Sequence, residues 1–155
     1  HVALKWLERL LPTSASNEAE TAERNQLNLM RAVLMLEVAQ SDFQESDVET
    51  QEIEALISVQ FGGEHHDGEG SVRDILTDAR KEKAESAGLY EYTRLACETL
   101  SMEDRVQLVA QFWQIAYADG VIDKYEEAAI RKVSDLLYVP HSDFIRAKLS
   151  AQALR

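Results

Sequence analysis

Apolar side chains recur through most of the chain at the three- and four-residue spacing that places them on one face of an α-helix. Residues 32–39 (AVLMLEVA) are apolar nearly all round, which predicts a helix buried on most sides at the centre of the domain. No segment shows the apolar–polar alternation of a half-buried strand. The pattern therefore predicts an all-α fold, a compact bundle of about seven or eight helices.

Breaks in the pattern divide residues 1–155 into the predicted elements of one domain. We expect a short helix at 1–11 before Pro12, a polar linker at 13–17, a first helical hairpin at 18–62, a flexible glycine-rich loop at 63–70, a second helical hairpin at 101–139 and a C-terminal helix at 141–153. Two further helices are predicted between the loop and the second hairpin. Six of the predicted helix starts carry a residue suited to capping. The predicted N-caps are Asn17, Ser46, Ser71, Ser101, Asp123 and Ser142.

The two predicted hairpins repeat one another. Asp119, Asp123 and Glu126, followed by apolar residues, have counterparts 77 positions earlier (119 minus 42). The matched pairs are Asp42 and Asp119, Ser46 and Asp123, Glu49 and Glu126, Ile53 and Ile130, Leu56 and Val133, and Phe61 and Tyr138. In each copy a helix ends near an acid, and a capping box starts the next helix. An internal repeat of this kind predicts pseudo-two-fold symmetry within the domain.

The composition adds a formal charge of −12 at pH 7. Phosphate binding requires a basic surface, so this charge argues against nucleic acid and against an anionic membrane surface as partners. A cation or a protein partner is expected instead, and an acidic surface that only aids solubility is the alternative. No apolar run reaches the ~20 residues that span a bilayer, and the single cysteine, Cys97, cannot form an internal disulfide. We expect a cytoplasmic protein without membrane insertion, and the oligomeric state stays open.

Asp42 and Asp119 are the first candidates for chemistry. Each is predicted at the C-terminal end of a helix, where the helix dipole disfavours an acid by roughly 0.3–1 kcal/mol. The same placement in both copies needs a reason. Either the carboxylates accept hydrogen bonds from backbone amides and close the hairpins, or they bind a metal ion that offsets the unfavourable field.

A pseudo-two-fold axis would bring the two hairpin loops together, and their acids would form one oxygen-rich cluster. Its predicted metal ligands are Asp42, Glu45, Glu49, Asp119, Asp123 and Glu126. Hard cations such as Ca²⁺ or Mg²⁺ take oxygen ligands of this kind. Capping alone would also explain the acids at the two helix starts. Glu37, inside the apolar run, needs a partner, a metal or a proton, and we place it as a candidate neighbour of the ligands.

Other chemistry has weaker support in the sequence. His65 and His66, with Asp67 and Glu69, could bind zinc or copper, but four glycines within residues 62–70 favour a solvated loop. No Ser-His-Asp spacing, glycine-rich phosphate loop or Cys-His pairing is present, so nucleophilic catalysis is not predicted. We therefore expect a protein that is not an enzyme.

Residues from about Met30 to Arg155 resemble the TerB-like family, small helical proteins named after a bacterial tellurite-resistance component. The stretches that carry the likeness are 116–139 (AYADGVIDKYEEAAIRKVSDLLYV), 141–149 (HSDFIRAKL) and, more weakly, 36–56. The A-x-A-D-G-x-I-D-x-x-E pattern is the most specific part. It matches Ala116, Ala118, Asp119, Gly120, Ile122, Asp123 and Glu126.

The resemblance implies an all-α fold with internal pseudo-symmetry. It also implies a divalent-metal site at Asp119, Asp123 and Glu126 with their first-copy counterparts. We expect no cofactor besides this cation. In the first copy Phe43 replaces the glycine and Ser46 the second aspartate, which favours one site biased to the second copy. The family is also related to the N-terminal part of a membrane-anchored J-domain co-chaperone, which implies a protein-interaction role.

The sequence thus supports a non-enzymatic acidic helical module of stress response that binds a divalent cation and an unidentified protein partner. An interaction module without metal is the alternative. A metal-assisted hydrolase with Glu37 as its base is a third interpretation, because burial would raise the pKa of that carboxyl.

Overall fold

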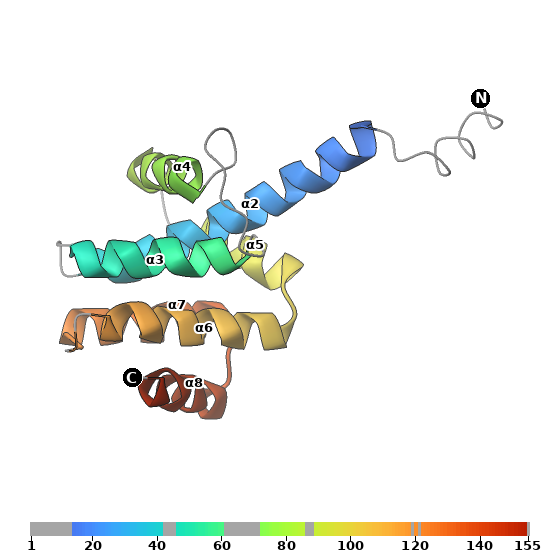
Figure 1. Cartoon of the computed structure of the whole chain (residues 1–155). Coiled ribbons are helices and arrows are strands. Elements are labelled where there is room, and N and C mark those ends of the chain that lie inside the picture. The colour runs from blue at the N-terminus through green and yellow to red at the C-terminus, as the bar shows by residue number, and fades with distance from the viewer. Residues whose placement is uncertain are drawn as a thin grey trace.

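The computed structural model describes residues 14–41, 46–60, 72–85, 89–118, 120 and 122–154. Its helices, labelled in Figure 1, are α2 (Ser14–Ala39), α3 (Asp47–Gln60), α4 (Val72–Glu85), α5 (Tyr90–Thr99), α6 (Met102–Tyr117), α7 (Lys124–Leu136) and α8 (His141–Ala153). Within these described ranges every regular element is an α-helix, as the apolar spacing predicted. The predicted helix at 1–11 and the predicted loop at 63–70 lie outside the described residues.

The helices form two units of three, α2–α3–α4 and α6–α7–α8, with α5 between them in the chain. In each unit the third helix packs on the first, α4 on α2 and α8 on α6. Between units the relation is reciprocal, because α3 contacts α6, α7 contacts α2, and α2 contacts α6. Figure 1 shows the result as layers: α4 and α8 lie on the outside, and α2 with α3 and α6 with α7 lie between them. This exchange is the predicted pseudo-two-fold arrangement.

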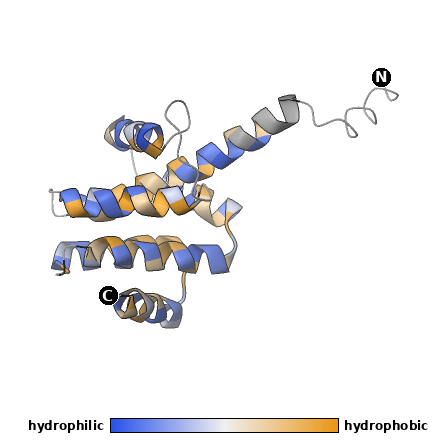
Figure 2. Ribbon diagram, viewed as in Figure 1, coloured by the Kyte–Doolittle hydropathy of each residue, from blue (hydrophilic) through white to orange (hydrophobic). Residues whose placement is uncertain are grey.

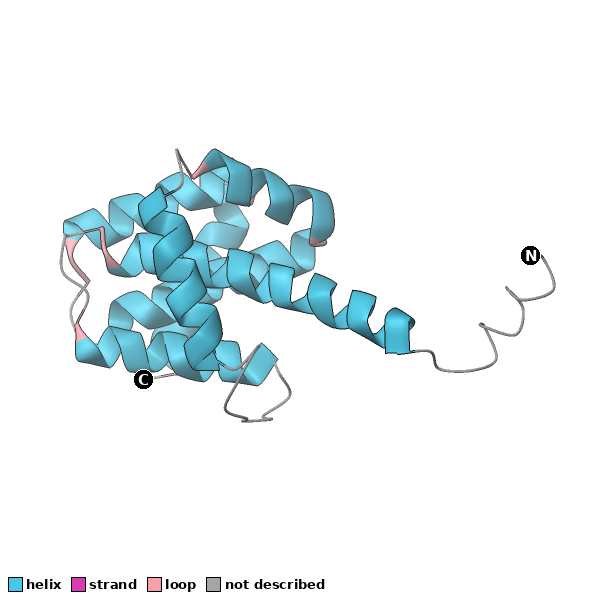
Figure 3. Ribbon diagram, turned by 90° about the horizontal axis from the view of Figure 1, so that it is seen from above, coloured by secondary structure: helices cyan, strands magenta, loops and turns pink. Residues whose placement is uncertain are grey.

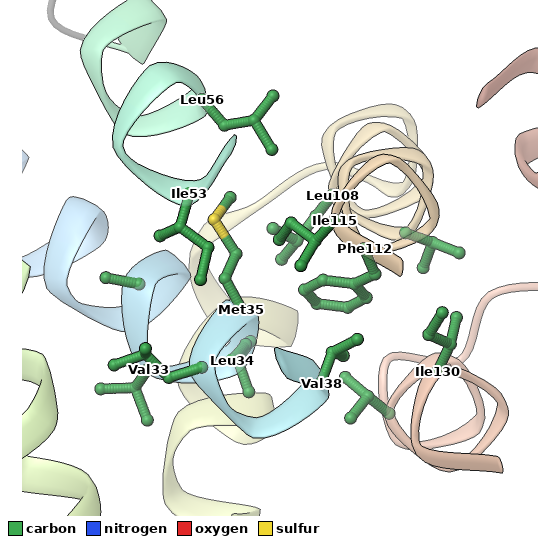
Figure 4. Packing of buried hydrophobic residues seen from close by; sticks show 14 of the residues in the cluster. Val33, Leu34, Met35, Val38, Ile53, Leu56, Leu108, Phe112, Ile115 and Ile130 are labelled. Carbon is green, nitrogen blue, oxygen red and sulfur yellow. The ribbon is translucent and has the colours of Figure 1, made fainter. Parts of the chain in front are cut away.

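The repeat extends into the first helix of each unit. Among the described residues, positions 77 apart are fully buried at six matched sites, each with 0% exposure. The pairs are Ala32 and Val109, Met35 and Phe112, Leu36 and Trp113, Val38 and Ile115, Ala39 and Ala116, and Ile53 and Ile130. In Figure 4 the Met35 side chain runs between Ile53 and the apolar residues of α6, and Val38 points toward Phe112. The shared core therefore lies where the two units meet.

The N-terminal part of α2 extends beyond the other helices in both ribbon views (Figures 1 and 3). The stretch of this segment that Figure 2 colours is mostly hydrophilic, and Glu20, Glu23 and Arg24 are exposed. Only from Asn28 onward do the side chains become mostly buried. A helix of this length is stabilised by packing of its apolar part, because a polar segment alone gains little in water.

Two predicted helix starts are wrong. The helix α2 begins at Ser14, so residues 14–17 are helical rather than a linker and Asn17 is not its N-cap. The last helix begins at His141 with Pro140 as N-cap, so Ser142 lies inside it. The ring of Pro140 restricts φ, here −60°, and with ψ at 148° the residue has the extended conformation of an N-cap. Its carbonyl accepts from the Phe144 N–H at 2.9 Å.

Candidate functional site

The start of α3 is a complete capping box. The Glu49 backbone N–H donates to the Ser46 Oγ at 3.1 Å, and the Ser46 N–H donates to the Glu49 Oε1 at 3.3 Å. The Ser46 hydroxyl donates to the same carboxylate oxygen at 3.0 Å. Two backbone N–H groups that the helix cannot satisfy internally are thereby paired, which confirms the predicted cap.

The start of α7 repeats this arrangement with an aspartate. The Tyr125 N–H donates to the Asp123 Oδ1 at 2.5 Å, and the Asp123 N–H donates to the Glu126 Oε1 at 3.5 Å. Before it, Gly120 has φ +90°, a conformation that side-chain-bearing residues rarely adopt, and its N–H donates to the Tyr117 carbonyl at 2.9 Å. The predicted capping box of the second copy is confirmed.

The glutamates of the two boxes share an unusual degree of burial. Glu49 and Glu126 are each only 2% exposed. The two helix starts lie at the same end of the bundle in Figure 1. Burying a carboxylate costs free energy unless hydrogen bonds or positive charge compensate for it. The N-terminal amides of each helix supply part of that compensation, since the helix dipole is positive there.

Of the six predicted metal ligands, the structure describes three, Glu49, Asp123 and Glu126. Asp42, Glu45 and Asp119 lie outside the described residues, as does the histidine-containing stretch at 65–69. In the part of the chain that is described, no three His, Cys, Asp or Glu side chains are grouped as metal ligands would be. The predicted cluster as a whole therefore stays a prediction. Its chemistry, carboxylate oxygens throughout, fits Ca²⁺ or Mg²⁺ rather than a softer metal.

Glu37 forms an ion pair with a lysine of another helix. Its Oε2 lies 3.5 Å from the Nζ of Lys83, so the pair ties α2 to α4. The two side chains are 37% and 27% exposed, so the carboxylate is not sealed in the core. The charge that the apolar run left unexplained is thus balanced by a lysine of another helix.

A group of charged and aromatic side chains joins α6, α7 and α8. The Lys148 Nζ lies 5.1 Å from the centre of the Trp113 ring and 3.9 Å from the Glu127 Oε1. The Trp113 ring is 5.4 Å from Phe144. Burial, with the negative charge of Glu127, raises the pKa of Tyr117. This group stabilises the packing of α8 on α6 through cation–π and aromatic contacts.

The pattern analysis missed Arg105. Its guanidinium donates to the Leu137 carbonyl at 2.7 Å and lies 3.8 Å from the Cys97 Sγ. A backbone carbonyl at the end of α7 is thereby satisfied by a cation, a favourable match to the negative end of the helix dipole. No signal in the sequence identifies this contact, because α6 and the end of α7 are far apart in the chain.

A second missed feature is an open cleft of about 370 Å³ between α2, α4 and α5. It is lined by Gln26, Leu29, Met30, Glu82, Glu91, Tyr92, Arg94, Leu95 and Glu98. The sequence gives one weak indication of the acidic rim of this cleft. Glu91 and Glu98 are seven residues apart, which places both carboxylates on one face of a helix, two turns from each other.

The fold and the capped hairpins define an all-helical domain built from two related three-helix units. A family model described as tellurite resistance protein TerB matches residues 28–149, most of the chain. The chain belongs to the TerB family. The matched region begins where α2 enters the bundle, and it covers residues 28–62 of the first hairpin and the whole of the second.

Searches of curated proteins and of solved structures gave no match to this chain. None of the described helices combines the length and the apolar character needed to cross a bilayer.

Proposed function

We propose that this TerB-family domain is a non-catalytic acidic module that binds a divalent cation at its two hairpin turns and a protein partner on its surface. The family is described by a role in tellurite resistance. We therefore include a role in cytoplasmic stress response in the proposal. Tellurite itself is an anion and a poor match to a chain with a charge of −12.

The burial of the paired capping glutamates carries the cation proposal. Both copies keep a carboxylate that is 98% buried at the same position, although an exposed Glu or Gln would complete a capping box equally well. Each Glu uses one oxygen, Oε1, to accept the N-cap N–H.

In this proposal Asp42, Glu45 and Asp119 from the turns join Glu49, Asp123 and Glu126. The bound cation would offset the mutual repulsion of these carboxylates and rigidify the two turns. The second copy would dominate, since Asp123 supplies a carboxylate where Ser46 supplies a hydroxyl.

An interaction module without metal is the second candidate, and one observation favours it. Both capping boxes form completely from the protein's own atoms, so they explain Glu49 and Glu126 without a ligand. We do not extend the proposal to a hydrolase, because the Glu37 carboxylate is paired with Lys83.

Thermal unfolding of chelator-treated protein, with and without millimolar Ca²⁺ or Mg²⁺, tests the cation proposal. At 100 times Kd, a cation that binds only the folded state adds about 2.7 kcal/mol, or roughly 5–11 °C in Tm for a domain of this size. Asp119→Asn is expected to abolish the shift while the domain stays folded.

Asp135→Asn is the matched control. It removes the same charge from an exposed position near the opposite end of α7, and it should keep the full shift. A wild-type protein that no divalent ion stabilises would overturn the cation proposal and leave the interaction module. Equal loss in both variants would show a general charge effect rather than a site.

A further inference from the structure

The cleft between α2, α4 and α5 has an apolar floor. Met30 and Tyr92 are buried there, with 1% and 7% exposure, and Leu29 and Leu95 are half-buried beside them. The Tyr92 hydroxyl donates to the Glu82 Oε2 at 2.6 Å, which joins α5 to α4 across α2. This bond holds one wall of the cleft in position relative to the other.

The rim of the cleft is acidic. Glu82, Glu91 and Glu98 are exposed around it, against a single cation, Arg94. None of the ion pairs formed among the described residues involves Glu91, Arg94 or Glu98. The two α5 glutamates are seven residues apart, so they stand about 10.5 Å from one another along the helix. Because both glutamates are exposed and take part in none of these ion pairs, their carboxylates are accessible to a partner from solvent.

We propose that this cleft docks a basic amphipathic segment of the protein partner, an inference that rests on the partner-binding part of the proposed function. An apolar side chain of the segment fills the floor, and flanking lysine or arginine side chains meet Glu91 and Glu98. Long basic side chains suit such a site, because their methylene stems cover apolar surface while the charged ends reach the carboxylates.

Charge and shape together select this ligand. A small hydrated cation would make no favourable contact with the apolar floor, and a purely apolar segment would leave the carboxylates of the rim without a positive charge beside them. A volume of about 370 Å³ is near the lower end of ligand sites, which suits a few side chains of a segment lying across an open cleft. Charge complementarity would also speed association with the basic partner.

The probe is a fluorescein-labelled two-heptad peptide of leucine and lysine, titrated with the full chain by fluorescence anisotropy. Glu91→Gln with Glu98→Gln should weaken binding about three- to tenfold, the effect of two solvent-screened charge contacts. Arg94→Gln should tighten it, because the competing cation on the rim is gone. Amide chemical shifts should change on α2, α4 and α5.

The control is Glu54→Gln with Asp135→Asn, which removes two charges from exposed sites outside the cleft and should leave binding unchanged. Equal weakening by both double variants, or shift changes confined to other helices, would overturn the proposal. So would shifts at the cleft that depend on protein concentration without peptide, since they would assign the cleft to a second copy.

The cation assay separates this inference from the proposed function. The Glu91→Gln and Glu98→Gln protein should keep its Ca²⁺- or Mg²⁺-dependent shift. Failure of the peptide to bind wild-type protein rejects the cleft alone, whereas loss of the cation shift from wild type rejects the metal site alone.

Discussion

The α2–α3–α4 unit and the α6–α7–α8 unit agree where they face one another and diverge on their outer helices. Matched core positions such as Met35 and Phe112 are fully buried in both. The outer helix of the first unit is linked to α2 by the pair of Lys83 and Glu37, whereas the outer helix of the second is linked to α7 by the pair of Lys148 and Glu127. A shared core restricts the residues that build it, and the outer surfaces are under no such restriction.

The outer divergence has a functional consequence in our proposals. Beside the first unit, α5 packs along α2 and leaves the acidic cleft. In the second unit α8 packs closely on α6 through Phe144, Ala147 and Ala151. The cleft depends on α5, which belongs to neither unit, so our docking proposal concerns the side of the domain where α5 lies against α2 and not the repeated core.

The largest expected effect comes from truncating matched core residues. Phe112→Ala should lower the free energy of unfolding by about 3–5 kcal/mol and Met35→Ala by about 2–5 kcal/mol, because each leaves a cavity between the units. Urea unfolding followed by circular dichroism should remain a single transition in both variants, since the core is common. Two separate transitions would show that the units fold independently.

Removing the N-caps should lower the free energy of unfolding less than the core truncations do, and it compares the same position in the two copies. Ser46→Ala and Asp123→Ala should each cost about 1 kcal/mol, because the backbone N–H that each side chain satisfies loses its partner. Ser101→Ala is the control outside the repeat pair, where the Asp104 N–H donates to the Ser101 Oγ at 3.1 Å. If the cation proposal holds, Ca²⁺ should widen the gap between the two variants, with Asp123→Ala the more affected.

A smaller gain is expected at the end of α7. Tyr138 has φ +57° and is 74% exposed, and the N–H groups of Tyr138 and Val139 close the helix on the carbonyls of Asp135 and Ser134 at 3.0 and 3.1 Å. Glycine is the usual residue in this left-handed position. Tyr138→Gly should stabilise the domain by about 0.5–1 kcal/mol, the relief of strain less the added backbone entropy.

Tyr138→Ala keeps the strained conformation and should bring no such gain in chemical unfolding. A destabilised glycine variant would show instead that the exposed Tyr138 ring makes a favourable contact.

The smallest expected effect is a pH dependence at Tyr117. Its pKa is raised, so the folded state favours the neutral phenol. Its contribution is fully present below the ordinary pKa of about 10 and is lost as pH rises through the folded value, because the unfolded chain releases the proton first. Urea midpoints measured from neutral to alkaline pH should fall less in Tyr117→Phe than in wild type. Parallel curves would contradict this assignment.

Part of the candidate site could be predicted from the sequence. The capping boxes followed from Ser46 with Glu49 and from Asp123 with Glu126, because a cap depends only on residues three positions apart. The cap at Ser142 was wrong for an equally local reason, the extended conformation of Pro140. The predicted metal cluster requires the acids of the two hairpin turns to lie close together. The spacing of residues within one copy does not show how far apart the two turns are.

The sequence by itself determined the helical class, most helix ranges, the internal repeat and the burial of the apolar run at 32–39. The helices and the buried run depend on hydrogen bonds and apolar spacing within a few turns of one helix, and the repeat is visible when two stretches of the sequence are compared. Only the tertiary structure decided that the units exchange contacts, that Lys83 neutralises Glu37, that Arg105 satisfies the Leu137 carbonyl, and that α5 leaves an acidic cleft over α2. These depend on how helices distant in the chain pack together, and helical periodicity says which face is buried but not which neighbour buries it.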